Sequence, residues 1–308
     1  MTKHRIRIGV RDNRLCRILG EQVLELLKPH LGGASCVLVP VGHSSDRGRQ
    51  QPHRWPGEAL EHALSEGGVD IAVQDMKDLP PEPSAGILLA AVTERRTPFD
   101  VLIARDGIIM DELPEGSAIS AHTPLRRAQL LHYREDLAIV DFSGSLEERM
   151  RKLEMGEVDG LVVSASAVEH LGYQERVTEV FTTEVIVPAP GQGALGLQVH
   201  QKGSKDLLKL AKHLDDPIAR GEVEAERAFL AEISSDPAVA VGALAKLDGT
   251  LLHLEGIIAD RDGVKLYRDE EEGKPGDEAQ VGARLARRLL LDGARGVVGH
   301  AGNPLESH

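Results

Sequence analysis

The chain has 308 residues, more than one typical hydrophobic core accommodates, so two or three domains are expected. A formal net charge of −13 repels nucleic acid and anionic membranes, and an aromatic content of 3% argues against a base-stacking surface. No apolar run approaches the roughly 20 residues of a membrane span and no secretory leader precedes Ile6, which predicts a cytoplasmic protein. Two cysteines are too few for a disulfide framework, and no Cys/His cluster has the spacing of a metal site.

The first part of the chain has the pattern of a parallel α/β unit. Strand-like runs alternate with a stretch of apolar side chains at helical spacing, which implies a right-handed crossover. Residues 43–57 are polar, rich in Arg and interrupted by two prolines, which is typical of a loop. The predicted strands cover residues 5–10, 36–41, 69–73 and 87–92, and the predicted helices cover residues 15–27 and 58–65.

The segment QDMKDLP at residues 74–80 is the first candidate site. It places two carboxylates and one ammonium group at the carboxyl end of a buried strand, where ligands bind in open α/β sheets. Two carboxylates beside one ammonium group shift one another's proton affinities, as a proton-handling site requires. A solvated loop with an incidental ion pair is the alternative, and this stretch alone favours it.

A second α/β unit follows a predicted crossover at residues 93–98. Thr123 is a good N-cap and Pro124 suits the first helical position, so Arg126 and Arg127 fall in a first turn that disfavours cations. This placement indicates anion binding, although two surface arginines on an amphipathic helix explain it equally well. The predicted strands cover residues 101–104, 118–121, 138–140 and 160–164, and helices are predicted from residue 124, over 146–154 and from 168 to 171.

The last part of the chain begins with an irregular loop at residues 188–196. Its three glycines and two prolines allow close approach of a ligand, but no GK[ST] follows, so the match to a phosphate loop is weak. Three predicted strands joined by Asp-Gly turns indicate a small antiparallel sheet, and residues 269–277 are interpreted as a solvated acidic loop. The helices are predicted over 207–214, 219–233 and 278–291, and the strands over 239–243, 251–258 and 263–267.

Several of these stretches together resemble the porphobilinogen deaminase (hydroxymethylbilane synthase) family, from Ile6 to about Val297. They are RIGVR at residues 7–11, DIAV at 70–73, MKDLP at 76–80, LRR at 125–127, the loop at 188–196 and AERAFL at 225–230. The resemblance implies two α/β lobes like those of type II periplasmic binding proteins, with mixed, mainly parallel sheets and a cleft between them. It adds a small α+β C-terminal domain with a three-stranded antiparallel sheet. The implied domains are residues 1–94 with 191–214 returning, residues 99–188, and residues 217–308.

The resemblance also implies a reaction and a set of site residues. The family joins four porphobilinogen units head to tail, with release of ammonia, on a dipyrromethane primer that a thioether attaches to a cysteine. Its catalytic carboxylate falls on Asp78, which would donate a proton during ammonia loss and stabilise the azafulvene cation. Lys77 matches a lysine beside the cofactor. The residues at substrate- or cofactor-binding positions are Arg11, Arg126, Arg127, Arg149, Arg176 and Gln192, the arginines being suited to bidentate binding of carboxylates.

The sequence departs from the family pattern at the primer attachment. Pro237 stands ten residues after the triplet 225–227, where the cysteine is expected, and proline has no nucleophile. Cys16 and Cys36 fall in the first domain and are interpreted as small buried apolar residues. The family's lysine-rich loop is shortened to residues 45–57. The other departures are His53 and Glu58 at lysine positions, Ser143 in place of an arginine, Gln74-Asp75 in place of a His-Ser pair and Thr123-Pro124 in place of two serines.

Two functions follow from this comparison. The first, slightly favoured, is a transferase of the porphobilinogen deaminase class in tetrapyrrole synthesis, which holds its primer without the usual bond or uses another pyrrolic substrate. The second is a catalytically inactive homologue that binds a pyrrole, a linear tetrapyrrole or another polycarboxylate. A two-lobed anion receptor with no link to pyrroles fits the fold, but nothing specific favours it. Each function predicts a small anionic ligand, a monomer, and no nucleic acid, membrane or metal.

Overall fold

The structure is a computed structural model, and it describes residues 5–42, 55–142, 144–233, 236 and 238–300. The chain forms two compact units, of which unit 1 comprises Met1–Arg96 and Ala194–Val223 and unit 2 comprises Thr97–Gly193 and Glu224–His308. The chain therefore leaves unit 1, returns to it and leaves it again. The domain boundaries that the resemblance implies stay a prediction.

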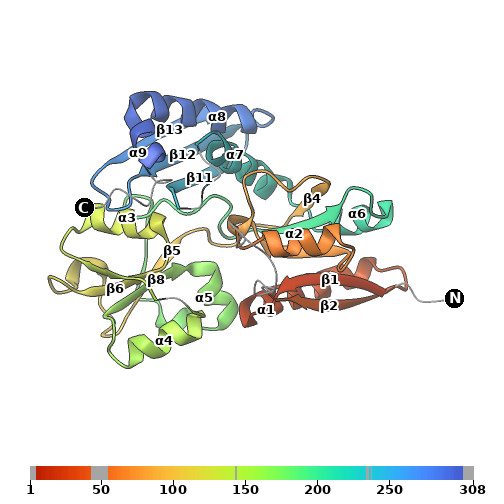
Figure 1. Ribbon diagram of the computed structural model, residues 1–308, viewed down its shortest axis with the longest axis horizontal. Helices are drawn as coiled ribbons and strands as arrows, with labels where there is room; N and C mark the ends of the chain where they lie inside the picture. The colour runs from red at the N-terminus through yellow and green to blue at the C-terminus, as the bar shows by residue number, and fades with distance from the viewer. Residues whose placement is uncertain (1–4, 43–54, 143, 234–235, 237, 301–308) are drawn as a thin grey trace. The chain divides into compact units, whose positions relative to one another are not determined.

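Unit 1 contains a five-stranded sheet in the order β2-β1-β3-β10-β4 (Figure 1). β1 pairs in parallel with β2 and β3, whereas β10 is antiparallel to both β3 and β4. Because β10 lies between β3 and β4, the sheet is completed only when the returning segment is in place. The strands are β1 (Arg5–Arg11), β2 (Ser35–Val41), β3 (Ile71–Asp75), β4 (Ile87–Val92) and β10 (Leu195–His200).

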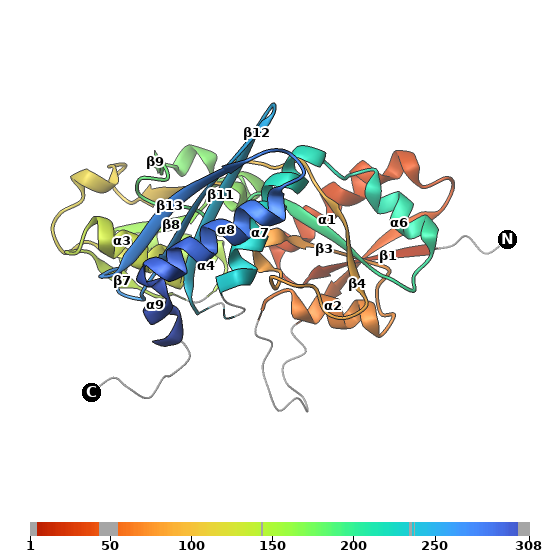
Figure 2. The same cartoon turned by 90° about the horizontal axis from the view of Figure 1, so that it is seen from above.

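Helices cover both faces of this sheet (Figure 2). Asn13 caps the first helix, since its side chain accepts a hydrogen bond from Cys16 N at 2.8 Å. On the face covered by this first helix, Val23 and Leu27 pack in one core with strand residues, and on the other face of the sheet Leu60 packs in a second core. The alternation of side chains along the strands separates the two cores. The helices are α1 (Arg14–Leu27) and α6 (Lys205–Lys212) on the first face, α2 (Glu58–Ser65) on the second, and α7 (Pro217–Ile233), which begins in unit 1.

Unit 2 contains a second five-stranded sheet, in the order β7-β6-β8-β5-β9. β6 is parallel to β7 and β8, and β5 is antiparallel to β8 and β9. Leu130 of α3 packs in the core of this sheet with Leu102 and Ile119, while α4 and α5 lie along its other face (Figure 1). The elements are β5 (Asp100–Ala104), β6 (Ala118–Ala121), α3 (Pro124–Tyr133), β7 (Ala138–Val140), α4 (Leu146–Glu154), β8 (Gly160–Ser164), α5 (Ala165–Leu171) and β9 (Glu179–Val180).

The end of the chain adds a three-stranded antiparallel sheet in the order β11-β12-β13. One face is covered by the second half of α7 and by α8, where the Phe229 ring lies 2.6 Å from the position of a Cβ on Gly256. The other face lies against α3, whose Leu125 packs with Val187 and Ile257. The elements are β11 (Ala240–Asp248), β12 (Leu251–Ala259), β13 (Leu266–Gly273), α8 (Glu278–Leu289) and α9 (Arg295–His300).

The predicted fold class is confirmed, but the position of the third strand of the small sheet was wrong. Residues 260–265 form a turn, in which the Asp260 carboxylate accepts a hydrogen bond from Lys265 N at 3.1 Å. The strand instead runs through the acidic residues predicted as a solvated loop. It pairs with β12, and Arg288 of α8 offsets part of its negative charge by pairing with Asp269 and Glu271.

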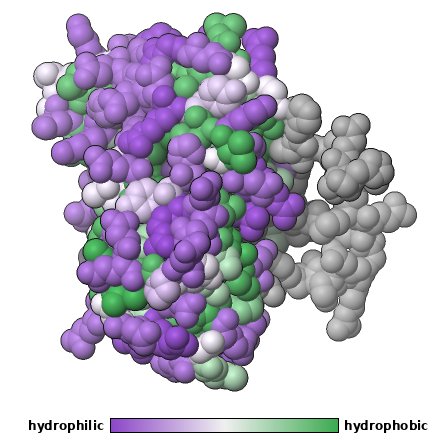
Figure 3. All heavy atoms as spheres, turned by 90° about the vertical axis from the view of Figure 1, so that its left-hand side faces the viewer, coloured by the Kyte–Doolittle hydropathy of each residue, from purple (hydrophilic) through white to green (hydrophobic). Residues whose placement is uncertain are grey.

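The surface is largely polar where it can be seen. On the face shown in Figure 3, hydrophilic side chains predominate and apolar ones gather in small groups between them. No helix in the described part of the chain is both long and apolar enough to cross a membrane.

Candidate active site

The segment QDMKDLP forms the end of β3 and a single 3₁₀ turn, η2 (Met76–Asp78), in unit 1. Asp75 pairs with Leu195 in the adjacent strand β10, and Met76 N donates to the Ala194 carbonyl at 2.9 Å. The Met76 side chain is fully buried with Leu79 in the core below the turn. Both the backbone and the apolar side chains therefore anchor the turn, and its charged side chains stay partly exposed.

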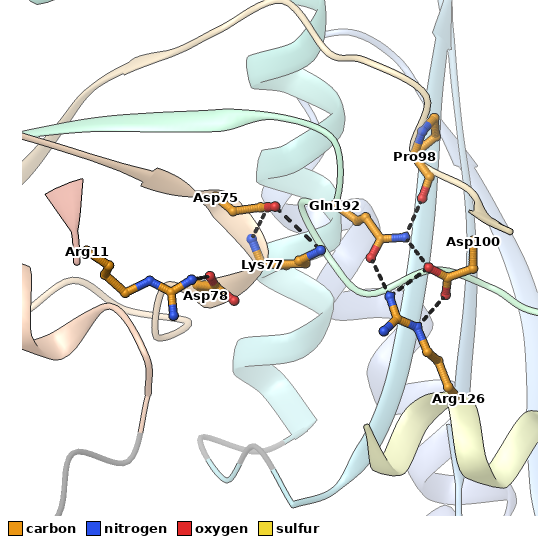
Figure 4. Close-up of polar contacts among 8 residues, drawn as sticks. All are labelled: Arg11, Asp75, Lys77, Asp78, Pro98, Asp100, Arg126 and Gln192. Carbon is orange, nitrogen blue, oxygen red and sulfur yellow. Dashed lines mark hydrogen bonds and ion pairs between the residues drawn. The ribbon is translucent and has the colours of Figure 1, made fainter. Parts of the chain in front are cut away.

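Asp78 forms an ion pair with Arg11, the last residue of β1 (Figure 4). About four fifths of each side chain is buried, because 19% of Arg11 and 17% of Asp78 is exposed. Burial lowers the pKa of Arg11, but the fields of Asp78, Cys16 and Asp75 outweigh it and leave that pKa raised. The guanidinium group thus stays charged and holds the carboxylate that the sequence predicted as catalytic.

Asp75 binds Lys77 on the same turn. Its carboxylate accepts a hydrogen bond from Lys77 N at 3.3 Å and lies 3.4 Å from the Lys77 ammonium nitrogen (Figure 4). Burial raises the pKa of Asp75; the charge of Lys77 opposes this and that of Asp78 adds to it, and the net shift is upward. The four charged residues therefore form two neighbouring pairs, Arg11–Asp78 and Lys77–Asp75.

In unit 2, Arg126 is engaged by a buried carboxylate. Its Nε and Nη2 donate to the two oxygens of Asp100 at 3.0 and 2.8 Å, and only 2% of the Asp100 side chain is exposed. Arg126 also donates to the Gln192 amide oxygen at 3.4 Å, and the Gln192 amide nitrogen donates to Pro98 O and Asp100 (Figure 4). The predicted residues Arg126 and Gln192 thus belong to one bonded group.

Arg149 of α4 differs from Arg126, since its Nε and Nη1 are buried and have no hydrogen-bond partner among the described residues. Burial lowers the pKa of Arg149 to about 10, the charge of Arg126 adds to this effect, and Asp141 opposes it. A buried guanidinium group with unused donors is strongly stabilised by an anion that reaches it. The prediction that Arg149 binds an anionic ligand stays a prediction, and these unused donors are consistent with it.

The remaining predicted arginines pair with acids elsewhere. Arg127 donates to Asp262 at 3.2 Å, in the turn between β12 and β13, and Arg176 donates to Glu154 at 3.0 Å. The structure brings Arg126 and Arg149 within electrostatic range of each other. It gives Arg127 and Arg176 acidic partners of their own.

One acid in these groups, Asp100, is absent from the sequence analysis. It was missed because it looks like the start of an apolar strand, although a carboxylate leading into four buried residues needs a cationic partner. Asp75 was predicted as one of the two carboxylates of the segment QDMKDLP, without a role distinct from that of Asp78. Glu226, which the resemblance marks without a reason, accepts from Gly191 N at 2.6 Å and Ala245 N at 2.8 Å. It thereby fixes the glycine-rich loop that carries Gln192.

Several sequence departures fall on positions outside the described residues, namely Pro237, His53 and Ser143. Glu58 lies at the start of α2, where its carboxylate accepts from Trp55 N at 3.2 Å. Cys16 is buried in the core of unit 1, and Cys36 is half-buried against the same core. Burial raises the pKa of both thiols.

These features define an α/β protein with a carboxylate held on a strand-end turn and a buried arginine suited to an acidic ligand. The family model "Porphobilinogen deaminase, dipyromethane cofactor binding domain" matches residues 6–208, and "Porphobilinogen deaminase, C-terminal domain" matches residues 221–291. The chain belongs to the porphobilinogen deaminase family.

Relatives with this name match over most of the chain. The porphobilinogen deaminase of Pelotomaculum thermopropionicum is 37% identical over 298 residues, which cover 95% of each chain. That of Rubrobacter xylanophilus is 41% identical over 240 residues, 78% of this chain and 77% of the relative. Among solved structures, a TRAP periplasmic solute binding protein from Desulfovibrio salexigens is similar with a TM-score of 0.43 and 12% identity, over 70% of this chain and 73% of that one.

Proposed function

We propose that the protein is a porphobilinogen deaminase that joins porphobilinogen units to hydroxymethylbilane with release of ammonia, in tetrapyrrole synthesis. The observation that carries the proposal is the ion pair between Arg11, at the end of β1, and Asp78, in the turn after β3, in a chain of this family. The enzyme is a transferase that works as a monomer in the cytoplasm on a small anionic pyrrole. The family resemblance supports these last points, and light scattering on the purified protein tests the monomer.

Asp78 has a role in each half of the reaction. The first half breaks the bond between the aminomethyl carbon and its nitrogen, and the pyrrole nitrogen's electrons form an azafulvene cation as ammonia leaves. A carboxylate held by Arg11 binds the departing ammonium group and then stabilises that cation. The second half forms a carbon–carbon bond, and the proton on the attacked ring carbon must leave. The same carboxylate can accept it.

The family's cofactor is a dipyrromethane, whose side chains are carboxylates, and the described residues fit them. Arg149 offers two buried, unused donor atoms, and the Arg126 guanidinium group, although paired with Asp100, lies within electrostatic range of it. When bound, the primer supplies the ring carbon to which new units are added.

The attachment of the primer does not fit a thioether. Position 237 is proline in the sequence, and the two thiols of the chain, Cys16 and Cys36, pack against the core of unit 1. We infer that ionic contacts with arginines hold the primer in place of a covalent bond.

The second candidate is a catalytically inactive homologue that binds a pyrrole, a linear tetrapyrrole or another polycarboxylate. Pro237 favours it, since loss of the anchor leaves a ligand-binding scaffold. Asp78 argues for turnover, because a protein that only binds an acidic ligand does not require a largely buried carboxylate at the end of β3.

One set of measurements separates these functions. The purified protein is incubated with porphobilinogen, uroporphyrin fluorescence is followed after oxidation, and the intact mass is recorded before and after. Product with no adduct in the mass supports the proposal, and a pyrrolic adduct would refute ionic attachment. Calorimetric binding without product would establish the second candidate. The absence of both binding and product would overturn both functions.

Variants of two aspartates complete the design. Asp78→Asn should abolish product formation while binding persists. Asp70→Asn is the matched control, because Asp70 pairs with Arg7 at 2.7 Å at the opposite end of the same strand region and should retain turnover.

A further inference from the structure

Asp75 is the part of the turn that neither the family pattern nor the proposed reaction uses. The family pattern has a His-Ser pair where this chain has Gln74-Asp75, so Asp75 adds a negative charge that a serine does not carry. The carboxylate is 15% exposed and contacts both the backbone N–H and the ammonium group of Lys77. Its backbone is fixed by pairing with Leu195.

The position of Lys77 makes this extra charge consequential. Lys77 lies between two carboxylates on one short turn, with Asp75 two residues before it and Asp78 one residue after it. A lysine side chain is a point charge on a flexible stem, so it settles beside whichever carboxylate holds it better. With serine at position 75, Asp78 would be the remaining carboxylate on the turn, and Lys77 would settle beside it.

We propose that Asp75 is a positioning residue, which holds the Lys77 ammonium group on its own side of the turn and leaves the Asp78 carboxylate to Arg11. The inference rests on the proposed function, in which Asp78 meets the ammonium group and the cation of the reaction. A carboxylate shared by two cations attracts a third positive group less than a carboxylate paired with one. Asp75 thus keeps Asp78 receptive to the reacting pyrrole.

The local charges agree with this arrangement. Arg11 and Lys77 contribute two positive charges and Asp75 and Asp78 two negative ones, so these four side chains are neutral together. A serine at position 75 would leave them with one net positive charge, which opposes a cationic intermediate. Lys77 and Asp78 act electrostatically on Asp75, and Asp78, Asp75 and the Cys16 thiol act on Arg11, the partner of Asp78.

A double-mutant cycle tests the proposal. The variants are Asp75→Asn, Lys77→Gln and the two together, with kcat and KM measured for porphobilinogen. We expect Asp75→Asn to lower kcat about tenfold with little change in KM, and to change kcat less than about twofold when Lys77 is already glutamine. Asp75→Ser should behave like Asp75→Asn. An equal loss of kcat in both backgrounds would show that Asp75 does not act through Lys77.

The melting temperatures of the same four proteins give a reading that does not depend on turnover. If Asp75 holds Lys77, the Asp75→Asn substitution lowers the melting temperature less when it is made in the Lys77→Gln protein than when it is made in the wild type. This holds whether or not porphobilinogen is a substrate. Additive losses would overturn the proposal even if the enzyme is active. Asp70→Asn is the control, because it removes a neighbouring ion pair and should lower the melting temperature without lowering kcat.

Discussion

Replacing Arg149 with methionine should stabilise the free protein and weaken its ligand binding at the same time. Burial and the charge of Arg126 lower the pKa of Arg149 from its ordinary value to about 10. Because the charged form is disfavoured in the folded state, the cost is complete at any pH below about 10 and disappears only above the ordinary pKa of an arginine. At neutral pH the folded protein therefore carries the whole penalty.

The size of the effect follows from that difference in pKa. The fall of this pKa from its ordinary value to about 10 corresponds to about 3 kcal/mol at 1.36 kcal/mol per pKa unit. Solvent near the partly buried side chain reduces this, so we expect a gain of about 1–2 kcal/mol from a methionine of similar length. In a chain of this size that raises the melting temperature by several degrees, on the order of 2–4 °C per kcal/mol.

The assay is urea unfolding at neutral pH together with calorimetric titration of porphobilinogen. Binding should weaken by about ten- to a hundredfold, since a charge-assisted hydrogen bond contributes roughly 1.5–3 kcal/mol. Arg151→Met, at an exposed position of the same helix, is the control and should change neither quantity appreciably. A destabilised Arg149→Met protein, or one that binds as tightly as the wild type, would refute the reasoning.

Three further changes test contacts elsewhere in unit 2. Asp100→Asn should lower the free energy of unfolding by about 3–5 kcal/mol, because Arg126 is then buried without its counter-ion; urea unfolding would show it, and a loss below 1 kcal/mol would mean that water reaches the pair. Gly263→Ala should cost about 2–4 kcal/mol in the same assay, since its φ is +70° and a Cβ would overlap a carbonyl of α3; a neutral effect would contradict this contact. Burial raises the pKa of Glu271, but hydrogen bonds from Arg288 and Arg284 outweigh this effect and leave the pKa of Glu271 below its ordinary value. Ionised Glu271 therefore stabilises the fold at any pH above its pKa in the unfolded chain, and this stabilisation is lost as the pH falls through its pKa in the folded protein. The melting temperature should therefore depend less steeply on pH in Arg288→Gln than in the wild type.

The sequence was sufficient for elements whose signals are local. The cap at Thr123, the first-turn Pro124 and the buried strand before Asp78 were predicted from neighbouring residues and are present. The acidic strand β13 was not predicted, because the arginine that compensates its charges lies on the next helix and its pairing depends on tertiary structure. The insertion of β10 between β3 and β4 also depends on contacts across more than a hundred residues, which periodicity does not encode.

At the candidate site, the sequence identified residue types better than partners. Asp78, Lys77 and Arg11 were named, and the structure pairs Asp78 with Arg11. The prediction that Asp78 and Arg126 both belong to the site for substrate or cofactor stays a prediction. Asp75 was named as one of two carboxylates beside a lysine, but its pairing with Lys77 was not predicted, because spacing alone does not decide which carboxylate a flexible lysine binds.

Arg126 shows why a charge in an unfavourable place does not by itself identify a ligand site. A cation in the first turn of a helix is unfavourable unless an anion lies nearby, and binding of an anionic ligand at Arg126 stays a prediction. The anion beside Arg126 is Asp100, which the chain supplies itself, so Arg126 has two nitrogens already in use. Arg149 also lies near the start of its helix, yet its buried donors lack a partner among the described residues. An external acid is therefore expected at Arg149, where the buried charge is uncompensated, while Arg126 contributes position and field.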